Sequence, residues 1–382
     1  METVLETRGE LITVESPEKL RELLGINGEE NSILTQETLA EPESDQRSEE
    51  DRLIKRLTEY VLRNGSLTEY EERVLKRLFP IRVRLLELED DTIPANTQKD
   101  FGTSQEMVIY RVGTLTMEPG SSMVIRNTQL IMDIQKLVRK RNSKEAVYDL
   151  SILGVDGKKG AAQTETGKQG GVGAQGALGT CSSPGIQGDD GGPGQQGEPG
   201  ADGQQGNRGE NGKKSMGAEI TIRSFSEDTT EFVVYTCSGA GGDGGEGGKG
   251  GKGGTGGAGG DGATCGCEGT SGGHGGPGGK GGKGGKGGTG GDGADGDDIT
   301  IKVPVGCKGM IKTASKEAEG GKGGAGGKGG DGGDGGKGGT GGKHHGDGST
   351  GGSGSGGEAG EIGDDSKVKG MPGHISIVEM NF

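Results

Sequence analysis

Glycine is the residue that most limits what this chain can fold into. Of the 91 glycines among 382 residues, 84 follow residue 150. They make up roughly 36% of that part, a share typical of collagen-like or other glycine-periodic sequences. Glycine has no side chain to bury, and only 26% of the whole chain is hydrophobic. The sequence therefore predicts a conventional head followed by a glycine-dominated tail, and it disfavours a single large globular enzyme.

Two glycine patterns divide the tail. Over residues 167–212 glycine occupies every third position except at Ser182, as in the extended chains of a triple helix. From residue 241 on, long runs carry two glycines in each triplet, and their third residues are mostly Lys and Asp. Glycine-rich chain is often a flexible linker, but a linker does not need a constant register. Bare backbone faces would let extended segments approach and pair N–H with C=O groups, so an ordered bundle is favoured over a disordered tail.

The interruptions between these runs indicate where the chain folds back. Residues 265–271 and 343–349 break the period, so the runs 241–262 and 272–291 are predicted legs that reverse at a loop. The pattern resembles the polyglycine-II bundles of certain phage tail-fibre tip adhesins and of the snow-flea antifreeze protein, and 167–212 resembles bacterial collagen-like repeats. The resemblance implies that binding specificity lies in the loops. The candidate binding-loop residues are Glu268, Thr270, Ser271, His274, Lys343, His344, His345 and Asp347.

The head shows helix signals first and strand signals after residue 80. Ser16 and Pro17 begin a short helix that Gly25 ends, and capping patterns at Ser48 and Thr68 begin two further helices that form a predicted hairpin. Alternating apolar residues then indicate strands, which we expect to form a small antiparallel module. These strands cover residues 81–85, 108–112, 115–117, 123–125, 130–132 and 147–152.

Strands are also predicted inside the tail. Residues 219–223 and 232–235 suggest a hairpin around 227–229, and 299–303 and 374–378 bracket the last runs. The predicted fold class is mixed: a small α+β head followed by a glycine-rich tail of polyproline-II or polyglycine-II helices with interspersed β-strands. The predicted domains are an acidic N-terminal segment with a short helix (1–47), a helical hairpin (48–80), a small β module (81–153), a collagen-like G-x-y segment (154–215) and a polyglycine-II bundle with flanking strands (216–382).

Five cysteines occur, and four of them flank or interrupt the glycine runs. These four, Cys237, Cys265, Cys267 and Cys307, are candidate disulfide partners, because disulfides would staple legs that own almost no hydrophobic core. Free thiols and a metal held by Cys265 and Cys267 are the alternatives, although that spacing is not that of a zinc ribbon. Cys181 is left over and is expected to be available for linking chains.

No catalytic or cofactor-binding pattern stands out. All four histidines lie in the tail, and no acidic pair has a predicted pocket around it, so we expect no enzyme, no cofactor and no metal. The net charge of −15 and the 3% aromatic content argue against nucleic acid as a partner. No apolar run is long enough to cross a membrane. The first residues lack the features of a secretory signal, so an extracellular or virion-surface location would require another route.

These observations predict a non-enzymatic structural or surface-display protein whose glycine-rich part is a rigid spacer or bundle. One alternative is a receptor-binding adhesin of a phage or injection device, and another is a collagen-like trimeric fibre built on residues 167–212. The expected partners are a cell-surface receptor or another structural protein, with a homotrimer as the assembly of the fibre alternative. Antifreeze activity is disfavoured, because the third positions are largely Lys and Asp rather than a flat row of small, weakly polar groups.

Overall fold

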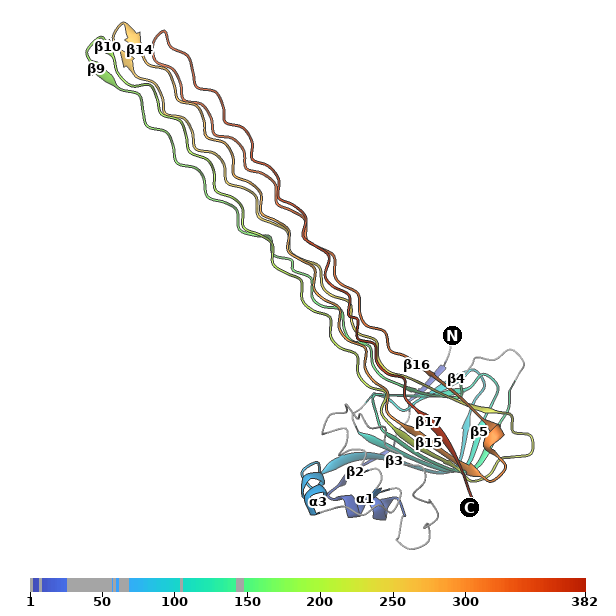
Figure 1. Cartoon of the computed structure of the whole chain (residues 1–382). Coiled ribbons are helices and arrows are strands. Elements are labelled where there is room, and N and C mark those ends of the chain that lie inside the picture. Colours follow the sequence, from blue (N-terminus) through green and yellow to red (C-terminus); the bar gives the residue numbers. More distant parts are fainter. Residues whose placement is uncertain are drawn as a thin grey trace.

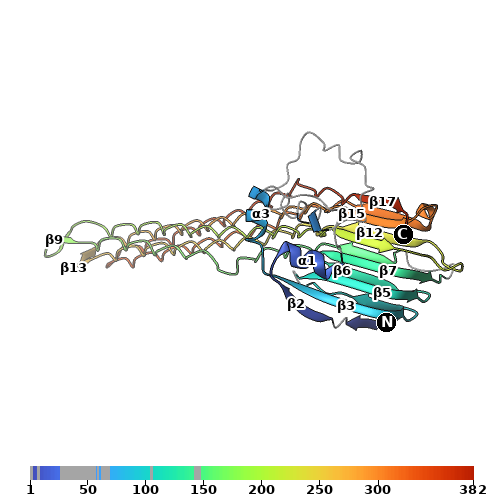
Figure 2. The same ribbon diagram turned by 90° about the horizontal axis from the view of Figure 1, so that it is seen from below.

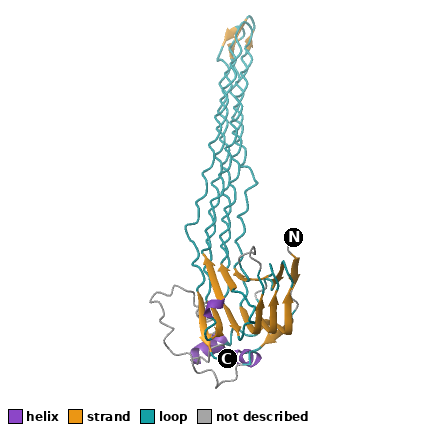
Figure 3. Cartoon of the chain, turned by 90° about the vertical axis from the view of Figure 1, so that its right-hand side faces the viewer, coloured by secondary structure: helices purple, strands orange, loops and turns teal. Residues whose placement is uncertain are grey.

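A long rod projects from a sheet-rich base in the computed structural model of the chain (Figure 1). The structure describes residues 3–6, 9–25, 57, 60–61, 69–103, 106–141 and 148–382. The base holds the long strands and the helices, and the glycine-rich segments make up the rod (Figure 3). No helix in these described parts is long and apolar enough to cross a membrane.

Two sheets form the base. One has seven strands in the order β17-β15-β11-β7-β5-β3-β2, and the other has six in the order β1-β4-β6-β8-β12-β16. The strands of the seven-stranded sheet are β2 (Glu10–Val14), β3 (Ile81–Ile93), β5 (Met107–Met117), β7 (Leu130–Arg139), β11 (Ala218–Ile222), β15 (Ile299–Pro304) and β17 (Ile375–Met380). Those of the six-stranded sheet are β1 (Thr3–Glu6), β4 (Thr97–Asp100), β6 (Ser122–Arg126), β8 (Leu150–Leu153), β12 (Phe232–Cys237) and β16 (Ile311–Lys316).

From β3 onward the chain visits the two sheets alternately, so that each full turn adds one strand to each sheet. Within the two sheets all neighbouring strands are parallel except β2 and β3, which pair in the antiparallel direction. The turns stack in register, since Leu130 of β7 lies opposite both Val108 of β5 and Ala218 of β11. The result is a coil of stacked parallel strands, which Figure 2 shows from below.

Apolar side chains from both sheets fill the space between them. Val108, Leu130, Ile220 and Ile299 come from four successive turns of the coil and are all fully buried there. Three of these four are β-branched, and β-branched side chains suit the pleated surface of a strand. Their burial on strands of both the head and the tail makes the base one continuous core.

A second apolar cluster lies on the outer face of the seven-stranded sheet, against the helices. α1 (Pro17–Leu23) and α3 (Glu69–Leu75) each contribute a fully buried leucine to it, Leu20 and Leu75. The Ser16 hydroxyl caps α1 by accepting a hydrogen bond from a first-turn N–H. The helix predicted after Ser16 is therefore confirmed.

The rod consists of three excursions inserted at the same corner of the coil. Each leaves at the end of a strand of the six-stranded sheet (β8, β12 or β16) and returns at the start of a strand of the seven-stranded sheet (β11, β15 or β17). By contrast, β6 crosses to β7 through residues 127–129 alone. The outgoing and returning halves, called legs 1 to 6, are residues 154–180, 188–217, 238–263, 270–298, 317–342 and 346–374.

Backbone hydrogen bonds with a period of three residues join the legs. In leg 3, the N–H of Gly254 donates to the carbonyl of Glu198 in leg 2 (2.8 Å), and the Gly254 carbonyl accepts from Gly279 in leg 4 (2.8 Å). Other bonds of leg 3 reach legs 1 and 5. The legs thus satisfy one another's backbone groups, which a single extended segment would leave to water.

The number of neighbours around a leg explains the two glycine patterns. Leg 3 has four neighbouring legs and two glycines in most triplets. A Cβ on Gly254 would lie 1.8 Å from the carbonyl oxygen of Gly171, and one on Gly253 would lie 2.0 Å from that of Gly279, so both positions exclude a side chain. Leg 6 bonds only to legs 4 and 5, and Gly352 in this leg has open space around it.

The structure corrects the predicted fold class of a small α+β head with a tail of polyproline-II or polyglycine-II helices. The described α1 and α3 have seven residues each, the legs belong to no assigned helix, and strands of the tail complete the same two sheets as strands of the head. The protein is therefore mostly β-sheet. The predicted antiparallel module is also wrong, because its strands pair in parallel through the alternating path of the chain.

Two further predictions about the tail are wrong. Residues 219–223 and 232–235 do not form a hairpin, since β11 and β12 lie in different sheets. The collagen-like segment 167–212 is not one continuous rod, because the chain reverses after residue 180 and its halves bond to each other in opposite directions. Of the helix predicted from Ser48, the structure describes only residues 57, 60 and 61, which are helical, and the cap at Thr68 lies outside the described residues. The domain boundaries stay a prediction.

Candidate functional site: the tip of the rod

Three loops meet at the free end of the rod, far from the base (Figure 1). The first two are hairpins, and the third is a turn at residues 343–344 between legs 5 and 6. The hairpin strands are β9 (Cys181–Ser183), β10 (Ile186–Gln187), β13 (Thr264–Cys265) and β14 (Glu268–Gly269). Gly185 and Gly266 occupy the hairpin turns with φ of 81° and 78°, a backbone conformation that favours glycine. The predicted reversal within 265–271 is therefore confirmed.

Several predicted loop residues hold the tip together. Thr270 is buried, its hydroxyl accepts from the N–H of Ala263 (2.7 Å), and its own N–H donates to the Ala263 carbonyl (2.8 Å). His274 Nδ1 accepts from the N–H of Ser349 (3.0 Å), which joins leg 4 to leg 6. These side chains are already engaged in the fold of the tip.

The remaining predicted residues gather at the same end. The Ser271 Oγ lies 3.5 Å from His345 Nδ1, and the Asp347 carboxylate accepts from the N–H of Gly341 (2.7 Å). Three more predicted residues, from two different loops, are exposed. They are Glu268, Lys343 and His344. The tip therefore presents an acidic, a basic and an imidazole side chain to solvent from adjoining loops.

Sequence reasoning missed two exposed apolar side chains beside these loops. Ile186 in β10 is 58% exposed, and Leu178 near the end of leg 1 is 63% exposed. The break in the glycine period at Ser182 was the signal that could have marked this first reversal. Apolar side chains bordered by polar ones are the usual composition of a protein-binding surface.

A disulfide joins the first two excursions at the tip. It links Cys181 in β9 to Cys265 in β13, 84 residues apart in sequence. The predicted pairing of Cys265 with Cys237, Cys267 or Cys307 is wrong, and Cys181 is not left over. Cys237 in β12 and Cys307 in the turn after β15 lie in the base, at the opposite end of the rod, so they cannot reach Cys265.

The other three cysteines are free thiols. Cys267 is exposed at the tip, and Cys237 and Cys307 are partly buried in the base. No group of three His, Cys, Asp or Glu side chains suited to a metal occurs in the part of the chain that the structure describes.

Replacing Cys265 by Ser is expected to destabilise the tip. A crosslink that closes a long loop restricts the unfolded chain, and we expect a loss of about 2 kcal/mol, the low end of the usual range, because bonded legs already limit the open state. Hydrogen exchange of the amides around β9 and β13 measures this loss. Cys267→Ser is the matched control and should leave exchange unchanged. Equal exchange in both variants and the wild type would contradict the role of the disulfide.

Ion pairs connect neighbouring legs along the rod. Lys252 of leg 3 lies 2.8 Å from Asp334 of leg 5, and Lys286 of leg 4 lies 2.7 Å from Asp364 of leg 6. These hydrogen bonds lower the pKa of both carboxyl groups and raise the pKa of both lysines. Because all four side chains contact solvent, each pair adds little stability and chiefly favours the observed order of legs.

Acidification is expected to weaken the rod slightly through these pairs. Since the folded-state pKa values of Asp334 and Asp364 are lowered, their contribution is present above the ordinary carboxyl pKa of about 3.9 and is lost as the pH falls through the lower folded values. Melting temperatures of the wild type and of the Asp334→Asn/Asp364→Asn variant should therefore differ at neutral pH and converge in acid. A difference that is constant with pH would contradict this expectation.

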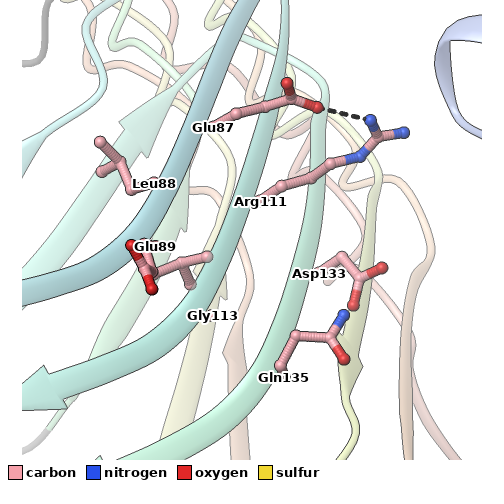
Figure 4. A pocket seen from close by; sticks show the side chains of 8 residues that line it. Glu87, Leu88, Glu89, Arg111, Gly113, Asp133 and Gln135 are labelled. Atoms are coloured by element: carbon pink, nitrogen blue, oxygen red, sulfur yellow. Dashed lines mark hydrogen bonds and ion pairs between the residues drawn. The ribbon is translucent and has the colours of Figure 1, made fainter.

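A second candidate site is a depression of about 350 Å³ on the outer face of the seven-stranded sheet (Figure 4). Its lining residues are Glu87, Leu88, Glu89, Arg111, Val112, Gly113, Asp133 and Gln135. Arg111 donates to Glu87 (2.7 Å) and to the Leu23 carbonyl (2.6 Å), and Arg223 holds Asp133 through hydrogen bonds of 2.9 and 2.8 Å. Most of the charges in the depression are thus already paired, and its lining holds no Ser, Cys or His.

The depression lies where the strands bend. Along β5, Val112 and Leu115 are both buried, while Gly113 and Thr114 between them are half-exposed. The residues of this strand that belong to the core between the sheets therefore change from even-numbered before Gly113 to odd-numbered after Thr114. A Cβ on Gly113 would lie 2.2 Å from the Glu89 carbonyl oxygen. The glycine therefore serves the close approach of β3 and β5 at the bend.

The comparisons with known proteins show no family. No protein-family model matches the chain, and no curated protein matches it. One solved structure, described as "Crystal waters on the nine polyproline type II helical bundle springtail antifreeze protein from Granisotoma rainieri match the ice lattice", aligns at 24% identity over 53% of this chain and 94% of that chain, with a TM-score of 0.07. A score this low carries no argument. The resemblance to polyglycine-II and collagen-like proteins inferred from the sequence is corrected by the fold itself: two large sheets define it, and the legs belong to no helix.

Proposed function

We propose that this chain is a non-enzymatic display protein, in which the coil of strands is a base and the rod is a rigid spacer that presents the tip. The observation that carries the proposal is the bonding of six legs to one another at every third residue. A single glycine-rich segment is a flexible coil, whereas a bonded bundle resists bending. Leg 1, over residues 154–180, can span at most about 90 Å, which sets the reach of the tip.

Rigidity is the test of this function. The free cysteines are first replaced by Ser. Spin labels are then attached to a Lys322→Cys/Lys337→Cys variant, whose two sites lie in third positions of leg 5, and the distance between the labels is measured. A rigid spacer gives one narrow distance distribution, which collapses into a broad one in denaturant. A broad distribution in native buffer would overturn the spacer function.

Receptor binding by the tip is the second candidate function. It is favoured by the exposed charged and apolar side chains that three loops bring together at the far end of the spacer. This would make the protein an adhesin of a phage or injection device, and its partner a surface receptor. The excursions would then serve to hold a composite binding surface away from the base.

Tip substitutions separate the two functions. The triple variant Glu268→Ala/Lys343→Ala/His344→Ala should lose at least about tenfold in binding of labelled protein to intact bacterial cells, since residues at the centre of an interface carry most of its energy. The matched control is Lys322→Ala/Lys328→Ala/Lys337→Ala, which changes exposed side chains along leg 5 and leaves the tip intact. Equal binding by both variants would contradict recognition by the tip and leave the spacer function untouched.

A further inference from the structure

Among the residues that the structure describes, the seven-stranded sheet ends at β17 with no further strand beyond it. Among the strands that the structure describes, β17 pairs only with β15, with Ile375 opposite Ile299. Ile375 and Ile377 pack against the core and yet stay partly exposed, whereas Ile299 and Ile301 on the preceding strand are fully buried. The last turn of the coil therefore lacks the cover that a further strand gives to every earlier turn.

The backbone of β17 has groups that point away from β15. The N–H of Ile299 donates to the carbonyl of His374 (2.8 Å), and in a parallel pair only alternate residues of a strand bond to a given neighbour. The even-numbered residues of β17 therefore bond to β15. The odd-numbered Ile375, Ile377 and Glu379 direct their N–H and C=O groups to the open edge.

Edge strands that must stay unpaired usually carry lysines, and the two edges at this end of the base differ in that respect. β16, the last strand of the six-stranded sheet, has exposed Lys312 and Lys316. β17 has no lysine, and its one charged side chain, Glu379, is held by the N–H groups of Gly306 (2.9 Å) and Lys308 (3.2 Å). Of these two described edges, β17 is therefore the one whose side chains do not oppose pairing.

We propose that β17 is a dimerisation edge, where a second copy of this chain adds its own β17 in the antiparallel direction with Ile375 opposite Ile377 of the second copy. This register places the outward N–H and C=O groups of both isoleucines in reciprocal hydrogen bonds and puts Ser376 opposite itself on the two-fold axis. It pairs apolar side chains with apolar side chains on the core face. A second copy suits this edge because the same strand supplies both the outward N–H and C=O groups and the apolar side chains that lie opposite them.

The dimer has a defined geometry. Opposed strands run in opposite directions, so the two rods point away from each other and both tips stay free. Val368 and Met371 lie at the end of leg 6, just before β17, and are 55% and 64% exposed.

The proposed dimer contact lies in the base and uses no residue of the tip. The dimer and the display function are therefore independent, and either proposal can fail alone.

Sedimentation velocity on the full chain at micromolar concentration tests the assembly. The expected species has twice the 38.6 kDa mass of the chain. Ile377→Pro removes an outward N–H that β15 does not use and should give a monomer, whereas Ile377→Ala removes the same side chain, keeps the N–H and should still dimerise. A monomeric or trimeric wild type, or dimers of equal strength in both variants, would overturn the proposal.

Disulfide trapping tests the register. In a Cys267→Ser background, Ser376→Cys should crosslink two chains under mild oxidation, because directly opposed residues of a non-hydrogen-bonded antiparallel pair have Cα atoms only about 4.5 Å apart. Val378→Cys is the matched control: it lies on the same face, but in this register it opposes His374 of the second copy and should stay uncrosslinked. Equal crosslinking of the two variants would overturn the register, and no crosslink in either would overturn the edge contact.

Discussion

The Gly254→Ala variant is expected to lose about 3 kcal/mol or more of rod stability, since overpacking and a broken buried hydrogen bond both act at this site. The new Cβ would lie 1.8 Å from the carbonyl oxygen of Gly171, a backbone atom that cannot move without shifting leg 1. The N–H of Gly254 also bonds to Glu198 in leg 2, so three legs would separate locally. Hydrogen exchange along the legs measures the loss.

Gly352→Ala is the matched control in the same rod. Gly352 lies in the outer leg 6 with open space around it, so the added methyl group meets nothing. The change should be neutral or stabilise by about 0.5 kcal/mol, because alanine restricts the unfolded chain. If both variants lost the same stability, the exclusion of side chains from the interior of the rod would be contradicted.

The positions of the strands were largely predictable from the sequence. The alternating residues 108–112, 130–132 and 299–303 all lie within strands, because apolar residues at every second position suit a strand with one buried face. The partners of these strands were not predictable. Alternation is the same in a parallel and an antiparallel strand, and the partners of β15 are separated from it by long glycine-rich excursions.

The glycine patterns were correctly located but incompletely understood. Two glycines per triplet indicate bare backbone faces, and legs 3, 4 and 5 do present these faces to their neighbours. The pattern does not show that the legs are excursions from a coil of strands. The legs are recognised as excursions only because β11, β12 and β15, which lie between them in the sequence, are strands of the same two sheets as the strands of the head.

The candidate site was predictable as a set of loops and not as one surface. Breaks in the glycine period identified Glu268, Lys343 and His344, and the fold brings them together because the three excursions start at the same corner and reverse after similar lengths. The disulfide was not predictable, since spacing alone does not show that Cys181 and Cys265 occupy equivalent reversals of successive excursions.

The Asp149→Ala variant is expected to lose about 3 to 5 kcal/mol of stability, because it leaves a buried charge without its partner. Asp149 is fully buried beside β8, where its carboxylate accepts from Arg139 Nε (2.7 Å), from Arg141 and from the N–H of Val233 (2.7 Å). Arg139 is only 1% exposed, so its guanidinium cannot turn to water when the carboxylate is removed. Chemical denaturation monitored by circular dichroism measures the change.

A variant that removes both partners shows whether the loss comes from the arginine left without its carboxylate. Arg139→Met/Asp149→Leu removes both charges and fills part of the volume, so it should recover much of the stability, since apolar replacement of a whole buried pair is often nearly neutral. Recovery will be incomplete, because Arg139 also donates to the carbonyls of Met117 (3.3 Å), Glu118 (3.1 Å) and Lys140, and the double variant removes all three bonds. A double variant less stable than Asp149→Ala would mean that the pair matters for its hydrogen bonds to the backbone more than for the balance of charge. The bond from the N–H of Val233 to the Asp149 carboxylate would then add to the pairing of Leu150–Leu153 with Val234–Cys237 in holding β8 against β12.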